Sequence, residues 1–295
     1  VYSIYHARYC LVIKTRTNNI RKLQLNNIPI SDKIPELDIA IKAAQEASST
    51  ILEIYHSDYS TFTKNDDSPV TDADLKSNKI INEILSDTKY SILSEEDEDN
   101  QDRLSKDMIW IVDPLDGTSD FIDKTGEFTV MIALIKNKEP ILGVIAWPTE
   151  KILFVAQKNC GAFRYSDSKW DKISVTKIDQ LSKCRTIGSR HHLSDKEKKF
   201  IKKIGIEDFT SIGSSLKVGK ISSGEAEAYI TTTNKMKEWD TAASHCIISE
   251  AGGKMTDMLG NELTYNNKNV YHENGILVTN GLIHDKIVQE FKKLE

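Results

Sequence analysis

The sequence has little that would place it in a membrane, in a disulfide-stabilised scaffold or on a nucleic acid. Its 295 residues contain no apolar run long enough to cross a bilayer. The four cysteines are scattered and form no C-x-x-C pair, which argues against a zinc site and favours a reducing compartment. A formal net charge of -5 does not favour general nucleic-acid binding, although it leaves room for a local basic pocket. We therefore expect a cytoplasmic protein of one large domain or two modest domains.

Residues 1–35 differ from the rest of the chain because they carry several basic residues and no acid before Asp32. The chain starts with Val1 and not with Met, which is compatible with a fragment or with an upstream extension. A basic leader without acids is typical of an organelle transit peptide, and a poorly ordered tail fits it equally well. We expect poor order in this segment and leave import into an organelle open. The oligomeric state is also left open.

The next part of the chain predicts two helices followed by a run of strands. Amphipathic helices are expected from Pro35 and from Thr71, separated by a polar loop from Ser57 to Pro69. A strand over Tyr90 to Leu93 leads into an acidic loop over about 96–107. Strands at hairpin spacing follow the centre of the chain, which indicates an α+β layered domain over 36–180.

From about residue 181 strands and helices alternate instead, which is typical of a parallel or mixed sheet with helices on both faces. We therefore predict a layered α+β and α/β sandwich. In it, residues 36–180 form an N-terminal metal-binding domain, and residues 181–295 form a C-terminal substrate-binding domain.

The stretch from Met108 to Phe121 is the most informative part of the sequence. It begins as an apolar strand, which we expect to break at Asp113-Pro114 because proline has no amide hydrogen for a sheet ladder. Asp113 and Asp116 follow three residues apart, and carboxylates at the end of a strand suit Mg²⁺. The next two residues, Gly-Thr, form a turn whose free amides can bind phosphate oxygens. The alternative is an ordinary aspartate-rich turn.

Three further acids are expected near this stretch. Glu95 ends the strand that precedes it, and two neighbouring strand ends can place their carboxylates close together. Asp240 begins a helix, where it could equally be a plain N-cap. Asp74 follows Thr71 at the spacing of a capping box. Each signal is weak alone, but acids at element ends together with a Gly-Thr turn fit two-metal phosphoryl chemistry.

In combination, three stretches resemble motifs of the inositol monophosphatase superfamily, the Mg²⁺-dependent and lithium-sensitive phosphatases. These stretches are Asp113 to Phe121 (DPLDGTSDF), Glu95-Glu96 and Trp239 to Ala243 (WDTAA). The resemblance covers about residues 36–293 and implies an α-β-α-β-α sandwich. Within the superfamily the chain looks closest to 3'(2'),5'-bisphosphate nucleotidases of the CysQ type. That second resemblance is carried by residues 64–71, 126–130, 141–144 and 211–217.

The resemblance implies a role for each matching residue and implies two or three Mg²⁺ ions. One ion would be bound by Glu95, Asp113 and the Leu115 carbonyl, and a second by Asp113, Asp116 and Asp240. Asp74 and Thr118, with Glu95 and a third ion, would orient and activate the attacking water. The amides of Gly117 and Thr118 would hold the phosphate. Contacts to the rest of the substrate would come from Lys64, His191, Ser214, Ser215, Lys217 and Asp240.

The substrate contacts have plain alternatives. Ser214 and Ser215 could cap a helix, Lys217 could be a solvated surface lysine, and a loop histidine without a site role is the favoured interpretation of His191. CysQ-type sequences commonly carry an arginine after the strand of Tyr229, where this chain reads YITTTN. The cations that could replace this arginine are Lys235, Lys237, Lys217 and Arg190.

The resemblance implies a phosphatase that removes the 3'-phosphate of adenosine 3',5'-bisphosphate, giving AMP and phosphate. An inositol monophosphatase or a sugar bisphosphatase on the same scaffold is the alternative enzyme. An inactive nucleotide- or cation-binding regulator is the alternative of another class, which the presence of every expected acid argues against. No recognised nucleophile motif occurs, so metal-activated water is the expected nucleophile. The expected partner is thus a small nucleotide bisphosphate, with no nucleic acid and no transmembrane segment.

Overall fold

The computed structural model describes residues 27–64, 68–191 and 193–294, which fold into two main β-sheets and a short hairpin. The first sheet has seven strands in chain order: β3 (Ser91–Ser94), β4 (Met108–Asp116), β5 (Thr129–Lys136), β6 (Glu139–Trp147), β7 (Ile152–Gln157), β8 (Gly161–Ser166) and β9 (Lys169–Ile173). The second sheet has the order β11 (Asp208–Ile212), β10 (Arg185–Ser189), β12 (Ala228–Thr231), β14 (Ile276–Thr279) and β13 (Lys254–Thr256). The hairpin pairs β1 (Thr61–Thr63) with β2 (Pro69–Thr71).

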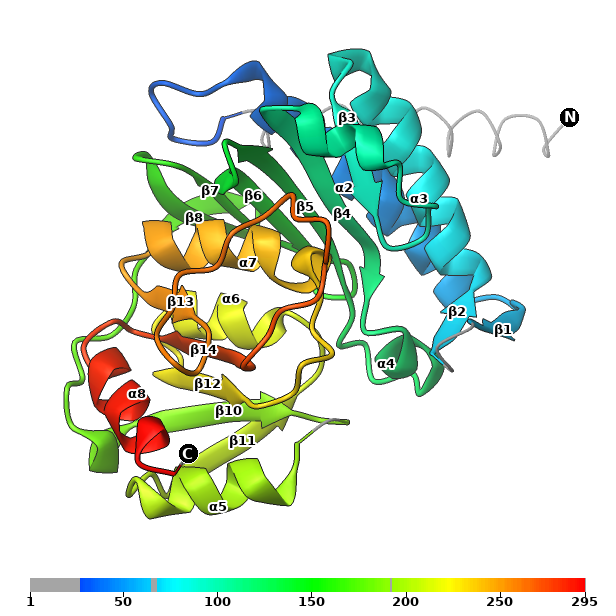
Figure 1. The fold of residues 1–295 in the computed structure, drawn as a ribbon. Helices are drawn as coiled ribbons and strands as arrows, with labels where there is room; N and C mark the ends of the chain where they lie inside the picture. Colours follow the sequence, from blue (N-terminus) through cyan, green and yellow to red (C-terminus); the bar gives the residue numbers. More distant parts are fainter. Residues whose placement is uncertain (1–26, 65–67, 192, 295) are drawn as a thin grey trace, which may run out of the picture.

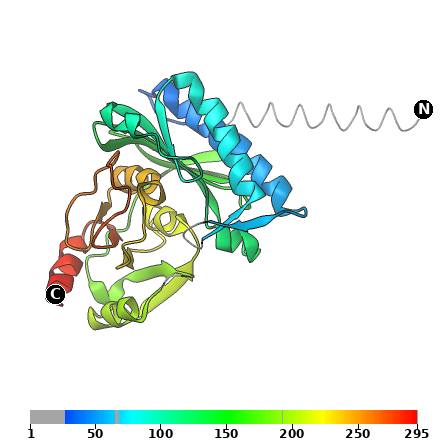
Figure 2. The same ribbon diagram turned by 45° about the vertical axis from the view of Figure 1, so that its right-hand side comes forward.

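Helices cover both faces of both sheets, so the described chain has five layers (Figures 1 and 2). The α-helices are α2 (Pro35–Tyr55), α3 (Asp72–Leu85), α4 (Thr118–Ile122), α5 (Asp195–Lys203), α6 (Leu216–Ser222), α7 (Glu238–Glu250) and α8 (His284–Lys292). Short 3₁₀ turns are η1 (Ser86–Thr88), η2 (Gln101–Ser105) and η3 (Leu181–Lys183). Helices α2 and α3 lie outside the seven-stranded sheet, α6 and α7 lie between the sheets, and α5 and α8 lie outside the five-stranded sheet (Figure 1). The predicted α-β-α-β-α sandwich is confirmed.

Three apolar cores correspond to the contacts between these layers. One joins α2 and α3 to the seven-stranded sheet, a second joins both sheets through α6 and α7, and a third lies under α5 and α8. Since the second core contains side chains from both sheets, the predicted domain boundary near residue 180 crosses a shared apolar layer. Burying this much apolar surface is the main stabilising contribution to such a fold.

Several predicted elements differ from the observed ones for identifiable reasons. Strand β4 does not break at Asp113 but continues to Asp116, because the ladder to β5 shifts register between these residues and Pro114 lies in the irregularity, where it does not need to donate. The predicted polar loop at 57–69 contains β1 and the first residue of β2. Strand β9 and the short helix α4 were not predicted.

The described part of the chain begins before the predicted first helix. Residues 1–26 lie outside the described residues, but residues 27–34 pack against the sheet. Ile28 and Ile30 are buried, and the Ile34 amide donates to Gln157 Oε1 at 2.9 Å. Among the described residues no helix combines the length and the apolar character needed to cross a membrane.

A buried histidine predicts how stability depends on pH. His284 is fully buried between two threonines, with Nε2 2.9 Å from Thr256 Oγ1 and Nδ1 2.9 Å from Thr279 Oγ1. Burial lowers the pKa of His284 to about 4. Because an unfolded histidine has a pKa of about 6.5, its contribution to stability is present above that pH and is lost as the pH falls towards 4.

We therefore expect His284→Gln, which keeps a donor and an acceptor but cannot take up the proton, to lose less stability in acid than the wild type. The difference between the two should amount to as much as about 3 kcal/mol between pH 7 and pH 4. Urea unfolding of both proteins at several pH values measures it. Parallel curves would show that His284 is not held neutral by the fold.

Candidate active site and metal centre

Three carboxylates meet where the seven-stranded sheet contacts helix α7. Ligand oxygens of Glu95, Asp113 and Asp240 all lie within 4.8 Å of one another. Glu95 and Asp113 emerge side by side because β3 and β4 are parallel neighbours, with Ser94 opposite Val112. Asp240 lies in the first turn of α7, and α7 lies between the two sheets (Figure 1). The predicted convergence of strand ends therefore occurs, although it is assembled from two layers of the sandwich.

The electrostatics of this group indicate a cation site. Burial and the nearby charges of Glu95, Asp116 and Asp240 raise the pKa of Asp113 well above its usual value. Burial, and then Glu95, raise the pKa of Asp240 to about 8. Carboxylates that destabilise one another in this way bind a cation or take up protons. The donors are all oxygen, which fits Mg²⁺ rather than a softer metal.

Asp116 lies beside this group rather than inside it. Its Oδ2 accepts hydrogen bonds from the Ser215 amide at 2.5 Å and from Thr129 Oγ1 at 3.3 Å. Burial raises the pKa of Asp116, while the positive charge of Lys217 opposes that shift. Next to it, the Leu115 amide donates to Asp113 Oδ1 at 3.1 Å. Neither Thr129 nor the amide contact to Asp116 was predicted.

Asp74 makes two sets of contacts, one at the start of α3 and one to Thr118. Its Oδ2 accepts from the Thr71 amide at 2.8 Å and from Thr71 Oγ1 at 2.6 Å, which completes a capping box at the start of α3. Its Oδ1 accepts from Thr118 Oγ1 at 2.9 Å. Asp74 is 1% exposed, and burial raises its pKa. A buried carboxylate, Asp74, and a hydroxyl, that of Thr118, are therefore hydrogen-bonded to each other, and Thr118 directly follows Gly117.

Asp240 is not the N-cap of α7, as one alternative had it. The helix begins at Glu238, so Asp240 lies in the first turn, and its Oδ2 accepts from the Lys237 amide at 2.6 Å. As with Asp74, this contact occupies one oxygen of the carboxylate, Oδ2, and leaves Oδ1 available to other partners.

Lys64 contacts acids rather than an open cavity. Its Nζ lies 2.9 Å from Glu95 Oε1 and 2.6 Å from Glu96 Oε1. Burial raises the pKa of Glu96 to about 7, and its hydrogen bond to Lys64 opposes that rise. The ammonium partly neutralises the acidic centre, and Glu96 is a neighbour to which the sequence assigned no role.

The loop over residues 211–217 lies directly against the 116–118 turn. A Cβ added to Gly117, which has a φ of 96°, would lie 3.1 Å from Ser214 Cβ. Ser215 occupies the N-cap position of α6, but its Oγ makes no capping hydrogen bond and lies 2.7 Å from Thr129 Oγ1. Lys217 is 7% exposed and donates to the Ser214 carbonyl, so it is not a solvated surface lysine.

The four cations suggested in place of an arginine after Tyr229 lie in different surroundings. Lys217 Nζ lies 5.2 Å from the centre of the Tyr229 ring, and Asp116 is its principal acidic neighbour. Lys237 Nζ lies 5.2 Å from the centre of the Trp239 ring, and Lys235 is exposed. Arg190 contacts two acids. Among these four cations, Lys217 is therefore the one whose principal acidic neighbour is Asp116.

His191 lies beside helix α4. Its Nε2 is 3.4 Å from Asp120 Oδ2 and 4.0 Å from Asp123 Oδ2. A role for His191 toward a substrate stays a prediction.

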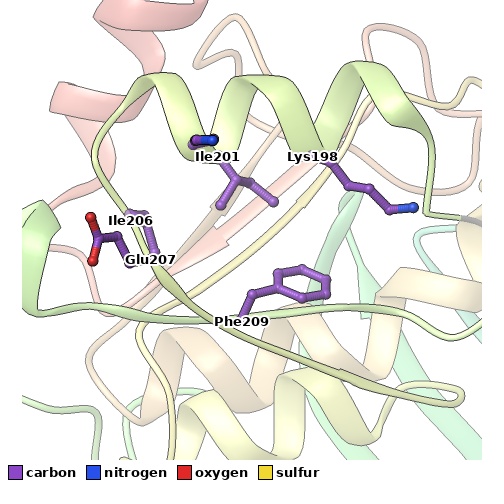
Figure 3. Close-up of a pocket in the computed structure, with 6 residues that line it drawn as sticks. Lys198, Ile201, Ile206, Glu207 and Phe209 are labelled. Atoms are coloured by element: carbon purple, nitrogen blue, oxygen red, sulfur yellow. The ribbon is translucent and has the colours of Figure 1, made fainter.

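A separate pocket of about 450 Å³ opens between α5 and β11 on the outer side of the five-stranded sheet (Figure 3). Its lining combines apolar side chains with two lysines and one acid: Lys198, Ile201, Lys202, Ile206, Glu207 and Phe209. None of these is a predicted site residue, so the pocket is distinct from the acidic centre.

A sequence model of the inositol monophosphatase family matches residues 32–295. The chain is 35% identical over 254 residues to the 3'(2'),5'-bisphosphate nucleotidase CysQ of Salmonella typhimurium, covering 82% of this chain and 99% of that protein. The structure of CysQ from Bacteroides thetaiotaomicron superposes with a TM-score of 0.72 at 33% identity, covering 83% and 96% of the two chains. The extragenic suppressor protein suhB of Bartonella henselae superposes with a TM-score of 0.76 at 26% identity, covering 88% and 99%.

The chain therefore belongs to the inositol monophosphatase family. It is a phosphatase of this family, and its sequence is similar to CysQ proteins over most of its length.

The clustered acids predict an unusual effect on stability without metal. Because the pKa of Asp240 is raised, its contribution to stability is full below the unfolded value near 3.9 and is lost as the pH rises towards 8. We expect Asp240→Asn, which resembles the protonated carboxyl, to unfold at a higher temperature than the wild type in chelator at pH 8. The advantage should shrink by up to about 1.4 kcal/mol for each pH unit on going to pH 5.

The matched control is Asp285→Asn, which removes an exposed acid from the first turn of α8. It should bring no gain, because acids in a first helical turn are mildly stabilising. A lower melting temperature for Asp240→Asn at pH 8 would contradict the interpretation that repulsion between carboxylates destabilises the centre.

Proposed function

We propose that this chain is a Mg²⁺-dependent phosphatase that removes the 3'-phosphate of adenosine 3',5'-bisphosphate, releasing AMP and phosphate in the cytoplasm. The observation that carries the proposal is the hydrogen bond from Thr118 Oγ1 to Asp74 Oδ1. Thr118 directly follows Gly117, and both lie near a carboxylate, Asp113, whose pKa is raised by burial and by its acidic neighbours. Two or three ions would be held by Glu95, Asp113, the Leu115 carbonyl, Asp116 and Asp240. Mg²⁺ bound there would lower the pKa of a bound water and neutralise charge on the phosphoryl oxygens.

The protein's own groups would perform the proton transfer. Thr118 Oγ1 donates its hydrogen to Asp74 Oδ1, so its lone pairs are free to accept a hydrogen bond from the attacking water. As that water loses its proton, Thr118 would take it up and pass its own to Asp74. The raised pKa of Asp74 favours this, because its carboxylate accepts a proton more readily than an exposed one.

The choice of a nucleotide is supported by the relatives and by the 211–217 loop. Relatives named as bisphosphate nucleotidases are up to 35% identical to the chain. A bisphosphate needs a cation near its second phosphate, and Lys217 beside Ser214 and Ser215 is the candidate. An inositol monophosphatase is the second candidate, supported by the fold shared with a structure of inositol monophosphatase from Anabaena at 26% identity and a TM-score of 0.69.

We expect Asp74→Asn and Thr118→Ala each to lower kcat by about 10²–10⁴-fold, with a smaller effect on KM, because a positioned base contributes that much to catalysis. Steady-state kinetics at saturating Mg²⁺ measures this. The control is Ser194→Ala, which breaks the capping box of α5. It should cost about 1 kcal/mol of stability and leave kcat unchanged. If Asp74→Asn behaved like this control, Asp74 would be a cap alone.

Substrate choice is tested with Lys217→Met, which keeps the volume of the buried side chain and removes its charge. The ratio of kcat/KM for adenosine 3',5'-bisphosphate to that for an inositol monophosphate should fall about tenfold or more, because a charge-assisted contact is lost. Lys220→Met, on the same helix and paired with Glu225, is the matched control. An unchanged ratio, or a wild type that prefers the inositol phosphate, would reject the nucleotidase while leaving the phosphatase in place.

A further inference from the structure

Three consecutive residues, Gly213, Ser214 and Ser215, join the 211–217 loop to the rest of the site. The Gly213 amide donates to Glu127 Oε2 at 2.6 Å. Ser214 packs on Gly117, and the Ser215 amide donates to Asp116 at 2.5 Å. The position of this tripeptide therefore sets the distance between the loop and the 116–118 turn.

The tripeptide is held by its surroundings and not by its own conformational preference. Ser214 has a φ of 48°, in the left-handed region that a residue with a Cβ adopts only at a cost. Gly213 leaves no room for a side chain, because an added Cβ would overlap the carboxylate of Asp120 and lie 2.7 Å from the Glu127 carbonyl oxygen. Asp120 and Glu127 thus enclose the loop from two sides.

Arg190 bridges these two acids. Its Nη2 lies 2.5 Å from Glu127 Oε2, the same oxygen that accepts the Gly213 amide, and its Nε lies 3.3 Å from Asp120 Oδ1. Without a cation between them, two carboxylates this close to one backbone segment would repel each other. The side chain of Asp120 is 3% exposed and that of Glu127 is 21% exposed, so water screens this repulsion only in part.

We propose that Glu127 and Arg190 form a latch that fixes Gly213–Ser215 against the 116–118 turn, and that both are positioning residues and not substrate contacts. The inference rests on the proposed phosphatase function and adds to it a determinant of substrate affinity. In this proposal Arg190 does not bind the second phosphate, because its guanidinium contacts Glu127 and Asp120.

A double-mutant cycle with Glu127→Ala, Arg190→Ala and the double variant tests the latch. KM and kcat are measured for adenosine 3',5'-bisphosphate and for an inositol monophosphate at saturating Mg²⁺. Each single variant should raise KM for both substrates by a similar factor of about ten, since each loses a charge-assisted contact, while kcat stays within a few-fold. The double variant should be no worse than the more damaging single one.

Two results would overturn the latch. A rise in KM confined to the bisphosphate and to Arg190→Ala would make Arg190 a substrate contact. Effects of the two single variants that multiply in the double variant would show that the residues act independently.

Glu127→Gln keeps an acceptor for the Gly213 amide and removes the charge, so its KM should lie between those of the wild type and Glu127→Ala. If Glu127→Ala does not fold, Glu127→Gln takes its place in the double-mutant cycle.

The control is the Arg164–Glu225 pair, whose side chains are 32% and 43% exposed and whose closest atoms are 3.4 Å apart. Alanine at either position should leave KM within twofold of wild type.

If the wild type hydrolyses only the inositol phosphate, the nucleotidase proposal fails, and the double-mutant cycle is measured with the inositol phosphate as substrate. If it hydrolyses neither, the affinity for inorganic phosphate with Mg²⁺, measured by calorimetry, replaces KM in the same comparison.

Discussion

Electrostatic repulsion among three carboxylates is the constraint on which the rest of the site depends. At 4.8 Å, two unit charges in surroundings of effective dielectric constant about 20 repel by roughly 3–4 kcal/mol. Glu95, Asp113 and Asp240 cannot therefore all be ionised without compensation. The structure compensates in part, with Lys64 on Glu95 and with raised pKa values for Asp113 and Asp240. A divalent cation bound there would reduce the repulsion and would therefore also stabilise the fold.

The layered architecture explains how the chain tolerates this repulsion. Two of the three acids extend from strands whose register is fixed by ladders on both sides of β4, and the third lies on α7, which is packed between the sheets. Relaxing the centre by moving the acids apart would require shifting α7 against two apolar surfaces. Large buried surfaces resist such shifts, because close-packed cores do not deform continuously. The apolar layers thus hold the polar groups in an arrangement that those groups alone would not adopt.

The sequence predicted the layers and the acids because both are local signals. Apolar periodicity defines helices such as α6, whose predicted range agrees with the observed one, and a strand followed by Asp-Pro-x-Asp-Gly places two carboxylates at a strand end. It could not predict the contacts that arrange the loop. Glu127, Arg190 and Gly213 lie in three separate connecting segments, and nothing in their local sequence indicates that they meet. Local sequence also left two alternatives open for Lys217, a substrate contact and a solvated lysine, since a lysine in an amphipathic helix usually points to water.

Asp74 shows why a structural and a catalytic interpretation of one residue need not compete. A carboxylate has two oxygens and several acceptor sites. In Asp74, Oδ2 serves the helix and Oδ1 serves Thr118, so the cap orients the group that is proposed to act as base. Asp240 is arranged in the same way, with one oxygen on the Lys237 amide and the carboxylate directed toward Glu95 and Asp113. Helix N-termini supply amides that fix the orientation of an acid without neutralising it, so an acid in a first helical turn is well suited to both tasks.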